Sequence, residues 1–431
     1  MTWREALEYI DSRPPRGERR GLERMRLLME KLGNPQKKLR FVHIAGTSGK
    51  GSTAAMTERM IRACGYHTGL FVSPHTFDFR ERIQLDGQLV DKTLLTETLE
   101  EMMPALRELD AMGDPSAAFE TLTALALCIF AKVQPDIVVL EVGIGGLLDS
   151  TNIIDAPEVA AICAISVEHT NLLGSTLTEI AQQKCGIIKP GCRVVGYCDF
   201  TMDALKVFRK TCRRLDIWPK IPDLSEVKLL SMTDEGSRIF WQEREWFIPL
   251  AGYHQVKNAL TALAILHQLR HAGFDLPDEK MAEGLRQCSF PGRMQIVRRE
   301  PTCLLDGAHN PGKIEALCQA LDSLYPGKQP IAVMGIMERK DYHTSVPMLA
   351  RRCKAFVAVD AEPGSGLGLP PEQLAREAEP FCPKVLVQPD GEAGAKAALA
   401  LAGPEDVLIA CGSVYLLESA KKGFLSTMPQ S

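Results

Sequence analysis

A glycine-rich segment near the N-terminus, residues 46–52, carries side chains that could bind a phosphate group. The apolar run 41–45 before it predicts a buried parallel strand, and residues 52–63 after it are rich in helix formers without Pro or Gly. A strand, a glycine turn and a helix direct backbone N–H groups and the positive end of a helix dipole at an anion. Lys50 can reach nucleotide phosphates, and Ser52 offers a hydroxyl to Mg²⁺. The segment therefore predicts an ATP-type site.

The spacing within this segment departs from the strict nucleotide-loop pattern. Gly51 separates Lys50 from the hydroxyl of Ser52, and Ile44 stands where the opening glycine is expected. A short glycine-lysine motif alone is a plain turn at least as often as a nucleotide site. The flanking strand and helix favour phosphate binding.

Polar residues also follow later predicted strands: Ser73 after 67–72, Glu141 after 136–140, and His169 after 159–167. Each has an ordinary alternative, namely a turn, a solvent-facing carboxylate and a packing histidine. The carboxyl ends of parallel strands meet at one edge of a sheet, where ligands bind. Three such residues beside a phosphate loop favour a metal–phosphate site over three coincidences.

The composition places limits on the class of protein. The chain has 431 residues, of which 45% are apolar and 24% charged, with a formal net charge of −4. These values predict a soluble protein of two domains and give no electrostatic case for nucleic-acid binding. Thirteen cysteines without a CxxC pair indicate reduced thiols. Without an apolar run of membrane-spanning length or a signal-peptide core, we expect a cytoplasmic protein that has no membrane partner.

Alternating helix and strand patterns predict an α/β fold. Helices are expected at 2–10, 21–32, 91–111, 117–133, 250–264 and 278–287. Residues 226–250 predict an antiparallel appendage, and a domain boundary is expected at 289–294. Beyond it, strands at 302–305, 329–334, 355–359, 384–387 and 407–410 predict a second, smaller parallel sheet.

These blocks together resemble the dihydrofolate synthase/folylpolyglutamate synthase family, part of the Mur ligase superfamily. The resemblance runs along nearly the whole chain, and it rests on 46–52, 68–75, 79–83, 119–126, 141–146, 149–152, His169, 184–190, 254–259, 291–293, 305–311 and 411–416. It implies an N-terminal P-loop ATPase domain of the Mur ligase type at 1–293. A C-terminal Rossmann-like domain, which carries the glutamate-ligase residues, is implied at 294–431.

The resemblance also implies roles for individual residues. Matches to nucleotide-binding positions are Gly49, Lys50, Gly51, Ser52, Asn258, Arg293 and Asp306. Matches to the ligands of two Mg²⁺ ions are Ser52, Ser73, Glu141 and His169. Matches to the pterin side of the cleft are Phe119, Glu120, Leu148 and Asp149, and those to the glutamate site are His309 and Ser413. Lys184 matches a lysine that is carboxylated to a carbamate in this superfamily, so Lys50, Lys184 and His309 are the implied catalytic residues.

The implied reaction is amide formation through an acyl phosphate. ATP phosphorylates a carboxylate, the α-amine of L-glutamate attacks, and amide, ADP and phosphate are released. The implied partners are therefore ATP, a pterin or folate and L-glutamate, and a monomer is expected.

Several positions depart from the family pattern. Leu147 replaces an arginine after the paired glycines, Glu168 replaces an aspartate, Gln295 replaces a glutamate, and Arg339 replaces an aspartate. The stretch 364–368 lacks an arginine. These departures leave the implied ATP and metal residues intact and fall on substrate and domain-closure positions.

Alternative functions therefore stay open at this point. One is a Mur-type ligase that joins a different acid to an amino acid, and another is a catalytically silent paralogue that binds nucleotide or folate. Lys50, Glu141, His169 and Lys184 favour a working enzyme. A P-loop kinase is disfavoured by the second α/β domain with its block at 306–311.

Overall fold

A computed structural model describes residues 1–14 and 21–426, and this part of the chain divides into two compact units. The first unit takes its described residues from Met1–Ser73, Arg80–Val227 and Lys257–Cys288. The second takes them from Pro74–Phe79, Lys228–Val256 and Ser289–Ser431. The domain division at residue 293 stays a prediction, since the compact units exchange short segments on either side of it.

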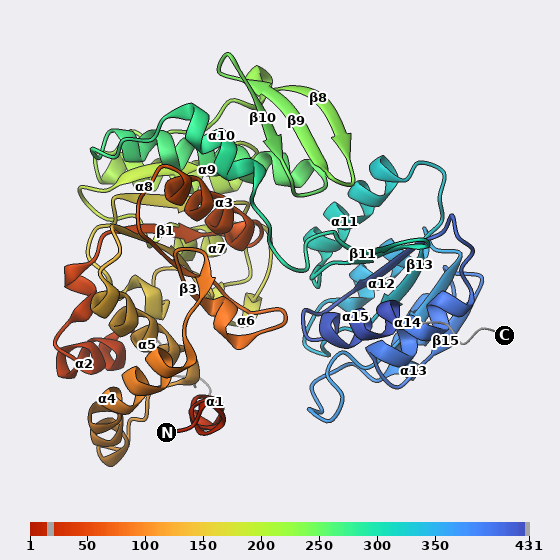
Figure 1. Ribbon diagram of the computed structural model, residues 1–431, viewed down its shortest axis with the longest axis horizontal. Helices are drawn as coiled ribbons and strands as arrows, with labels where there is room; N and C mark the ends of the chain where they lie inside the picture. The colour runs from red at the N-terminus through yellow and green to blue at the C-terminus, as the bar shows by residue number, and fades with distance from the viewer. Residues whose placement is uncertain (15–20, 427–431) are drawn as a thin grey trace. The chain divides into compact units, whose positions relative to one another are not determined.

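The first unit is built on a mixed sheet with the strand order β4-β3-β2-β5-β1-β6-β7 (Figure 1). Its strands are β1 (Phe41–Ala45), β2 (Thr68–Phe71), β3 (Ile83–Leu85), β4 (Gln88–Leu89), β5 (Ile137–Glu141), β6 (Val159–Ile162) and β7 (Arg193–Gly196). The strands β2, β5, β1, β6 and β7 run parallel to one another, as predicted. The strands β3 and β4 extend one edge of the sheet in antiparallel pairing. The central strands β1 and β5 are buried along their whole length, as expected for apolar runs in a parallel sheet with both faces covered.

Helices pack around this sheet, and α3 contacts β1, β2 and β5. The α-helices are α1 (Trp3–Ser12), α2 (Glu23–Lys31), α3 (Lys50–Ala63), α4 (Lys92–Ala111), α5 (Ala118–Val133), α6 (Thr170–Leu173), α7 (Leu177–Cys185), α8 (Met202–Arg214) and α10 (Asp278–Arg286). The 3₁₀ helices are η1 (Pro35–Lys38), η2 (Phe79–Arg82), η3 (Ser150–Ile153) and η4 (Leu224–Glu226). One core cluster joins β6 and β7 to α7 and α8 through apolar side chains such as Ile162, Val194, Ile180 and Phe208.

The strand predicted at 159–167 is shorter than expected, and this prediction was wrong at its carboxyl end. The strand β6 ends at Ile162. Cys163 still donates its N–H to the Ala45 carbonyl of β1, and from Ala164 on the backbone bonds to the glycine segment instead of to the sheet. The carbonyl of Ala164 accepts hydrogen bonds from the backbone N–H groups of Thr47 and Ser48, at 2.7 and 3.3 Å. The pairing thereby fixes the segment at 46–49 from one side.

The second unit contains an antiparallel sheet with the order β10-β9-β8, which confirms the predicted appendage. Its strands are β8 (Lys228–Thr233), β9 (Gly236–Trp241) and β10 (Arg244–Ile248). The helix α9 (Tyr253–Arg270) begins here, three residues later than predicted, and continues into the first unit.

The main sheet of the second unit has the order β11-β12-β16-β13-β14-β15. Its strands are β11 (Gln295–Arg299), β12 (Thr302–Leu305), β13 (Ile331–Met334), β14 (Ala355–Ala358), β15 (Val385–Val387) and β16 (Val407–Cys411). The predicted sheet was purely parallel. The structure corrects this, because β11 pairs antiparallel with β12.

Helices cover both faces of this second sheet. They are α11 (Pro311–Leu324), α12 (Tyr342–Ala350), α13 (Pro371–Ala378), α14 (Gly391–Ala400) and α15 (Leu417–Leu425). Along β12, Leu304 packs into the core under α11 and α12, whereas Cys303 and Leu305 pack into the core under α14 and α15. This alternation is the two-residue period of a strand that is buried on both faces.

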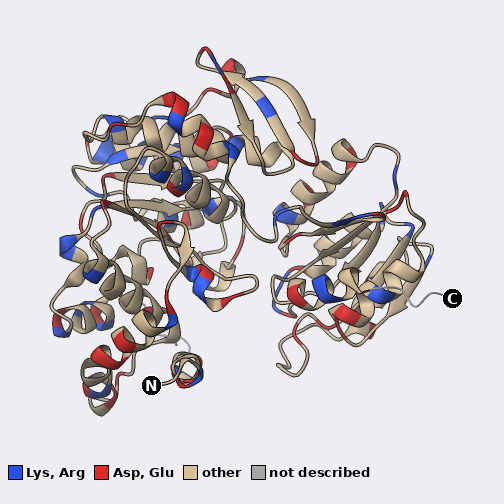
Figure 2. Cartoon of the chain, viewed as in Figure 1, with Lys and Arg blue, Asp and Glu red and all other residues tan. Residues whose placement is uncertain are grey.

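The cysteines are all free thiols, as predicted. Among the described residues, we find no helix that is both long and apolar enough to cross a membrane. Segments that carry Lys and Arg alternate with segments that carry Asp and Glu on the helices of each unit (Figure 2).

Candidate active site

The glycine segment between β1 and α3 has the geometry of an anion site. The helix α3 starts at Lys50, and its N-cap residue is Gly49, which has no side chain to cap the first turn. Gly49 has φ +86°, and a Cβ atom added there would lie 2.3 Å from Oδ1 of Asn258. Only glycine fits this conformation and this approach. The N–H groups of the first turn, together with the helix dipole, favour a bound anion.

The segment is also held by the loop that follows β6. The Thr47 hydroxyl donates to the Ser166 carbonyl at 3.0 Å, and the Ser166 N–H donates to the Thr47 hydroxyl oxygen at 3.1 Å. This loop continues to His169, which adopts a left-handed conformation with φ 53° at the start of α6. The imidazole Nε2 of His169 lies 3.6 Å from Oε1 of Glu168.

Glu141, Lys50 and Ser73 come together at the carboxyl edge of the sheet. The register pairs Ile44 of β1 with Glu141 of β5, which places the strand ends side by side. The Lys50 ammonium lies 4.0 Å from Oε1 of Glu141, and the Ser73 N–H donates to Oε2 of Glu141 at 2.9 Å. Glu141 is only 4% exposed. A buried carboxylate beside an ammonium, at the end of a phosphate-binding segment, suits a nucleotide and its cation.

The donor set offers mainly oxygen ligands to a cation. Ser52, Ser73 and Glu141 provide two hydroxyls and a carboxylate, and His169 provides a ring nitrogen. In residues 1–14 and 21–426 no group of three or more His, Cys, Asp or Glu could hold a metal by itself. Mg²⁺ is usually held by one or two carboxylates together with substrate phosphates and waters. The residues present therefore fit Mg²⁺ shared with a nucleotide, and the predicted ligand set stays a prediction.

Lys184 contacts the first residue of the glycine segment. It is located at the end of α7, it is 3% exposed, and its Nζ donates to the Gly46 carbonyl at 2.9 Å. The predicted residues Lys184, Lys50 and Glu141 are thus all found around one loop of the first unit.

Phe119 and Asp149 flank a single glycine on the loop after β5. A Cβ atom added to Gly143 would lie 2.6 Å from the Phe119 ring and 3.1 Å from Oδ2 of Asp149. Asp149 is 2% exposed, and its carboxylate accepts from Ile144 N–H at 2.9 Å and from Thr151 N–H at 3.0 Å. Leu148 is half-buried next to it. An aromatic ring beside a carboxylate acceptor suits a flat heterocycle with N–H donors.

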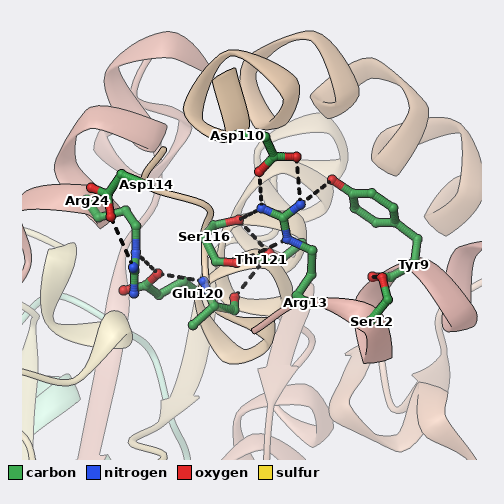
Figure 3. Close-up of polar contacts among 10 residues, drawn as sticks. Tyr9, Ser12, Arg13, Arg24, Asp110, Asp114, Ser116, Glu120 and Thr121 are labelled. Atoms are coloured by element: carbon green, nitrogen blue, oxygen red, sulfur yellow. Dashed lines mark hydrogen bonds and ion pairs between the residues drawn. The ribbon is translucent and has the colours of Figure 1, made fainter. Parts of the chain in front are cut away.

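The buried Glu120 carboxylate, like that of Asp149, accepts hydrogen bonds from the protein, and one of them comes from a buried arginine. Its Oε2 accepts from Arg24 Nε at 2.6 Å and from the Ala117 N–H at 2.9 Å (Figure 3). Burial alone would lower the pKa of Arg24, but the hydrogen bond and charge of Glu120 outweigh it and keep this pKa raised. These contacts assign Glu120 a structural part in fixing the start of α5, which carries Phe119.

Arg13 fixes the same helix start from another side. All five of its N–H donors are used, with Asp110, Ser116 and Tyr9 as the acceptors (Figure 3). Ser116 in turn contacts the Thr121 hydroxyl at 2.8 Å. The hydrogen bonding of Arg13 to the Asp110 carboxylate raises the pKa of Arg13. Neither arginine was singled out from the sequence, because their partners lie about a hundred residues away.

We expect Arg24→Met to destabilise the first unit by about 3 kcal/mol, since it leaves the buried Glu120 carboxylate without its cation. Chemical denaturation followed by circular dichroism measures this change. Arg26→Met is the matched control, because Arg26 is exposed and pairs only loosely with Glu23 at 3.7 Å, and its loss should cost less than about 0.5 kcal/mol. Equal effects of the two changes would contradict the assignment.

The predicted residues of the second unit lie around the carboxyl ends of β12 and β16. Asp306 accepts from the N–H groups of Met294 and Ala308, at 2.9 and 2.8 Å. The Arg293 guanidinium donates to the Gly292 carbonyl at 2.9 Å and lies over the Phe290 ring. Asp306 thereby fixes the segment that carries Arg293.

His309 and Ser413 follow the two neighbouring strands β12 and β16. The His309 Nδ1 lies 2.8 Å from the Gly307 carbonyl, so it carries a proton and Nε2 is an acceptor that faces Lys313 Nζ at 3.2 Å. Asn310 caps α11 through Oδ1 and is 4% exposed. The buried Ser413 lies on the turn after β16, whose Gly412 N–H donates to the Ala308 carbonyl at 2.8 Å. Each unit thus has its own cluster of predicted residues.

Comparison with known protein families gives two matches. The family described as Mur ligase middle domain matches residues 44–266, and the family described as Mur ligase, glutamate ligase domain matches residues 292–414.

Relatives with known names match most of the chain. The chain is 32% identical over 357 residues to the dihydrofolate synthase/folylpolyglutamate synthase of Bacillus subtilis, covering 80% of this chain and 82% of the relative. It is 34% identical over 444 residues to the probable bifunctional folylpolyglutamate synthase/dihydropteroate synthase of Haloferax volcanii, covering 98% of this chain. The chain spans about half the length of that relative and of a similar one from Halobacterium salinarum, at 50% and 53%.

Solved structures agree with these matches. The folylpolyglutamate synthase of Mycobacterium tuberculosis complexed with ADP and AMPPCP aligns with a TM-score of 0.89 at 28% identity, over 99% of both chains. FolC of E. coli in complex with DHPP and ADP aligns with a TM-score of 0.85 at 26% identity, over 98% of both chains.

Proposed function

The chain belongs to the dihydrofolate synthase/folylpolyglutamate synthase family of Mur ligases, and on that premise we propose that it is an ATP-dependent glutamate ligase. Its acid substrate is dihydropteroate, the γ-carboxylate of a tetrahydrofolate, or both. The observation that carries this proposal is the convergence of Lys50, Glu141 and the glycine-capped start of α3 on one glycine segment.

The first step makes the acid reactive. A carboxylate is a poor electrophile, so its oxygen attacks the γ-phosphorus of ATP, and the bond to ADP breaks to leave an acyl phosphate. The N–H groups at the start of α3 and the Lys50 ammonium bind the phosphates and neutralise the charge of the transferred group. When Mg²⁺ is bound at Ser52, Ser73, Glu141 and His169, it supplies further neutralisation of that charge.

The second step forms the amide. The neutral α-amine of L-glutamate attacks the acyl carbon, the tetrahedral oxyanion collapses, and phosphate leaves with the proton lost to solvent or a base. We assign the glutamate site to His309 and Ser413, and nucleotide contacts to Asn258, Arg293 and Asp306. Exclusion of water protects the acyl phosphate, because its hydrolysis would give the free acid and phosphate without forming an amide.

The acid substrate is assigned to the first unit. The Phe119 ring and the Asp149 carboxylate flank Gly143, which suits a pterin ring stacked on one side and hydrogen-bonded on the other. Leu148 completes this side. Glu120 holds the start of α5, which carries Phe119, and its contact with the acid substrate stays a prediction.

A product assay tests the proposed function. Purified protein is incubated with ATP, Mg²⁺, L-glutamate and either dihydropteroate or tetrahydrofolate, and products are identified by mass spectrometry. We expect ADP formation that requires both the acid and glutamate, with a product one glutamyl residue heavier. Turnover with another acid alone would instead indicate a different Mur-type ligase, and binding without turnover would indicate a silent paralogue.

Leu147 offers a test of substrate handling, since the family pattern has an arginine there. Leu147 is 44% exposed, so an introduced cation forms at most an exposed ion pair. We expect Leu147→Arg to lower KM for one of the two acid substrates by up to about fivefold while leaving KM for ATP unchanged. Val133→Arg, at a site of 45% exposure on α5, is the control. Steady-state kinetics identical to wild type on both acids would contradict a role of Leu147 in substrate handling.

A further inference from the structure

A buried histidine on β1 is linked to Asp149 by an unbroken chain of hydrogen bonds. The His43 Nε2 lies 2.9 Å from the Thr151 hydroxyl oxygen, and this hydroxyl lies 2.6 Å from Oδ1 of Asp149. His43 and Thr151 are fully buried, and Asp149 is 2% exposed. These hydrogen bonds therefore connect the middle of the central strand β1 with Asp149 on the acid-substrate side, and all three residues are shielded from solvent.

The direction of the protons along this chain follows from counting donors. A carboxylate oxygen only accepts, so the single Thr151 hydroxyl proton points at Asp149. The Thr151 oxygen must then accept from His43, which places the imidazole proton on Nε2. The other ring nitrogen, Nδ1, is buried and meets no partner in the described part of the chain. This fixes one tautomer of His43.

The imidazole also stays neutral. Burial, assisted by the charge of Lys189, lowers the pKa of His43 to about 3. The His43 N–H therefore donates in the same direction across the range in which the protein is expected to work.

The chain determines which acceptor sites of Asp149 remain for a ligand. Its Oδ1 accepts from both the N–H and the hydroxyl of Thr151, which uses both lone pairs of this oxygen. Its Oδ2 accepts from the Ile144 N–H and, within the described residues, from nothing else given by the structure. One lone pair of Oδ2 is left, and this oxygen lies close to Gly143, where an added Cβ atom would be 3.1 Å from it.

We propose that His43 is a positioning residue, which orients the Asp149 carboxylate toward the acid substrate through Thr151. This inference rests on the proposed function, because it takes Asp149 as a contact of the pterin ring. His43 lies on β1, three residues before Gly46, so the chain also ties the acid-substrate side to the strand that leads into the nucleotide loop. The role is a consequence of position and proton direction, and His43 itself touches no reacting atom.

Binding and kinetic measurements on matched variants test the proposal. His43→Leu removes the donor at similar volume, and His43→Gln retains an N–H donor. We expect the Leu variant to weaken dihydropteroate binding, followed by fluorescence without ATP, by about 5- to 10-fold. The Gln variant should recover at least half of that loss, and KM for ATP and glutamate should stay within about twofold of wild type.

Thr151→Val tests the second link of the chain. It should weaken binding of dihydropteroate by a similar factor, and the double variant with His43→Leu should be no weaker than the worse single variant, because both break one chain. Fully additive effects, or equal changes in the KM values of all three substrates, would overturn the proposal.

An NMR measurement on the wild-type protein is independent of activity and of variant folding. The ring nitrogens of ¹⁵N-labelled His43, assigned by comparison with His43→Gln, should show a protonated Nε2 and an unprotonated Nδ1 that do not change between pH 5.5 and about 8.5. A protonated Nδ1, or titration in this range, would contradict the inference. Failure of the product assay with these NMR results intact would instead reject the proposed function, and with it the contact of Asp149 with a pterin, while the hydrogen bonds from His43 through Thr151 to Asp149 would stand.

Discussion

Replacing Lys50 with methionine should lower ATP-dependent ligase turnover by about 10³-fold, the largest effect that we expect from a single change. The ammonium is located on the first residue of α3 and lies 4.0 Å from Glu141. At that separation it is not locked in a short ion pair, so it can reach the phosphates of a bound nucleotide. Methionine keeps the length of the side chain and removes only the charge and its donors.

The measurement is ADP release in the presence of dihydropteroate and glutamate, together with nucleotide affinity. The fold should survive, because Glu141 retains its hydrogen bond from the Ser73 N–H. Lys132→Met is the matched control, since Lys132 is bound to Glu101 and the Thr98 hydroxyl on another part of the unit. A Lys50→Met protein with turnover within tenfold of wild type would refute the assignment of the phosphate site.

The strand, turn and helix around the glycine segment were predictable because their signals are local in the sequence. An apolar strand, a glycine turn and a helix without breakers are contiguous at 41–63, and their geometry follows from backbone preferences. The polar residues after strands were found in the same way. Glu141 and Ser73 meet because parallel strands end at one edge, which is a rule of the fold and not of the particular sequence.

The supports of the site were not predictable, because they depend on contacts between distant segments. Arg13 and Asp110 are 97 positions apart, and Arg24 and Glu120 are 96 apart. Nothing in the surrounding residues marks either arginine as buried. His43 was hidden for another reason, since it lies within a run that was interpreted only as an apolar strand.

Errors in the predicted elements share one physical cause. The apolar residues after Ile162 resemble a strand, yet the Ala164 carbonyl bonds to the glycine segment. Gln295–Arg299 was not predicted as a strand, but it pairs antiparallel with β12. In both cases tertiary hydrogen bonding decides the backbone conformation that local pattern leaves open. Residues 74–79 and 228–256 group with the C-terminal residues in the second unit, and the local sequence pattern does not show this grouping either.

Lys184 matches a lysine that is carboxylated in the Mur ligase superfamily, and it lies in a buried environment. Its replacement is the second change from which we expect a large effect. Its Nζ is buried and donates to the Gly46 carbonyl at 2.9 Å. An ammonium satisfies that carbonyl, and so does a carbamate, which keeps one N–H while it adds two carboxylate oxygens. We propose the carbamate, since a carboxylate there would orient the cation and its waters, as outer ligands of metal sites do.

Lys184→Ala should therefore lower turnover by about 10- to 100-fold, and acetate or propionate should restore part of it by supplying a carboxylate in the space left by the side chain. Lys184→Gln is the matched control, because its amide N–H can still reach Gly46 while the longer side chain fills that space, so the same acids should not rescue it. Wild-type protein kept free of CO₂ should lose activity and regain it with bicarbonate, and a ¹³C carbamate signal should appear with labelled bicarbonate. If the turnover of the wild type does not depend on CO₂, and neither acetate nor propionate raises the turnover of the Ala variant, Lys184 acts as an ammonium that holds the nucleotide loop through Gly46.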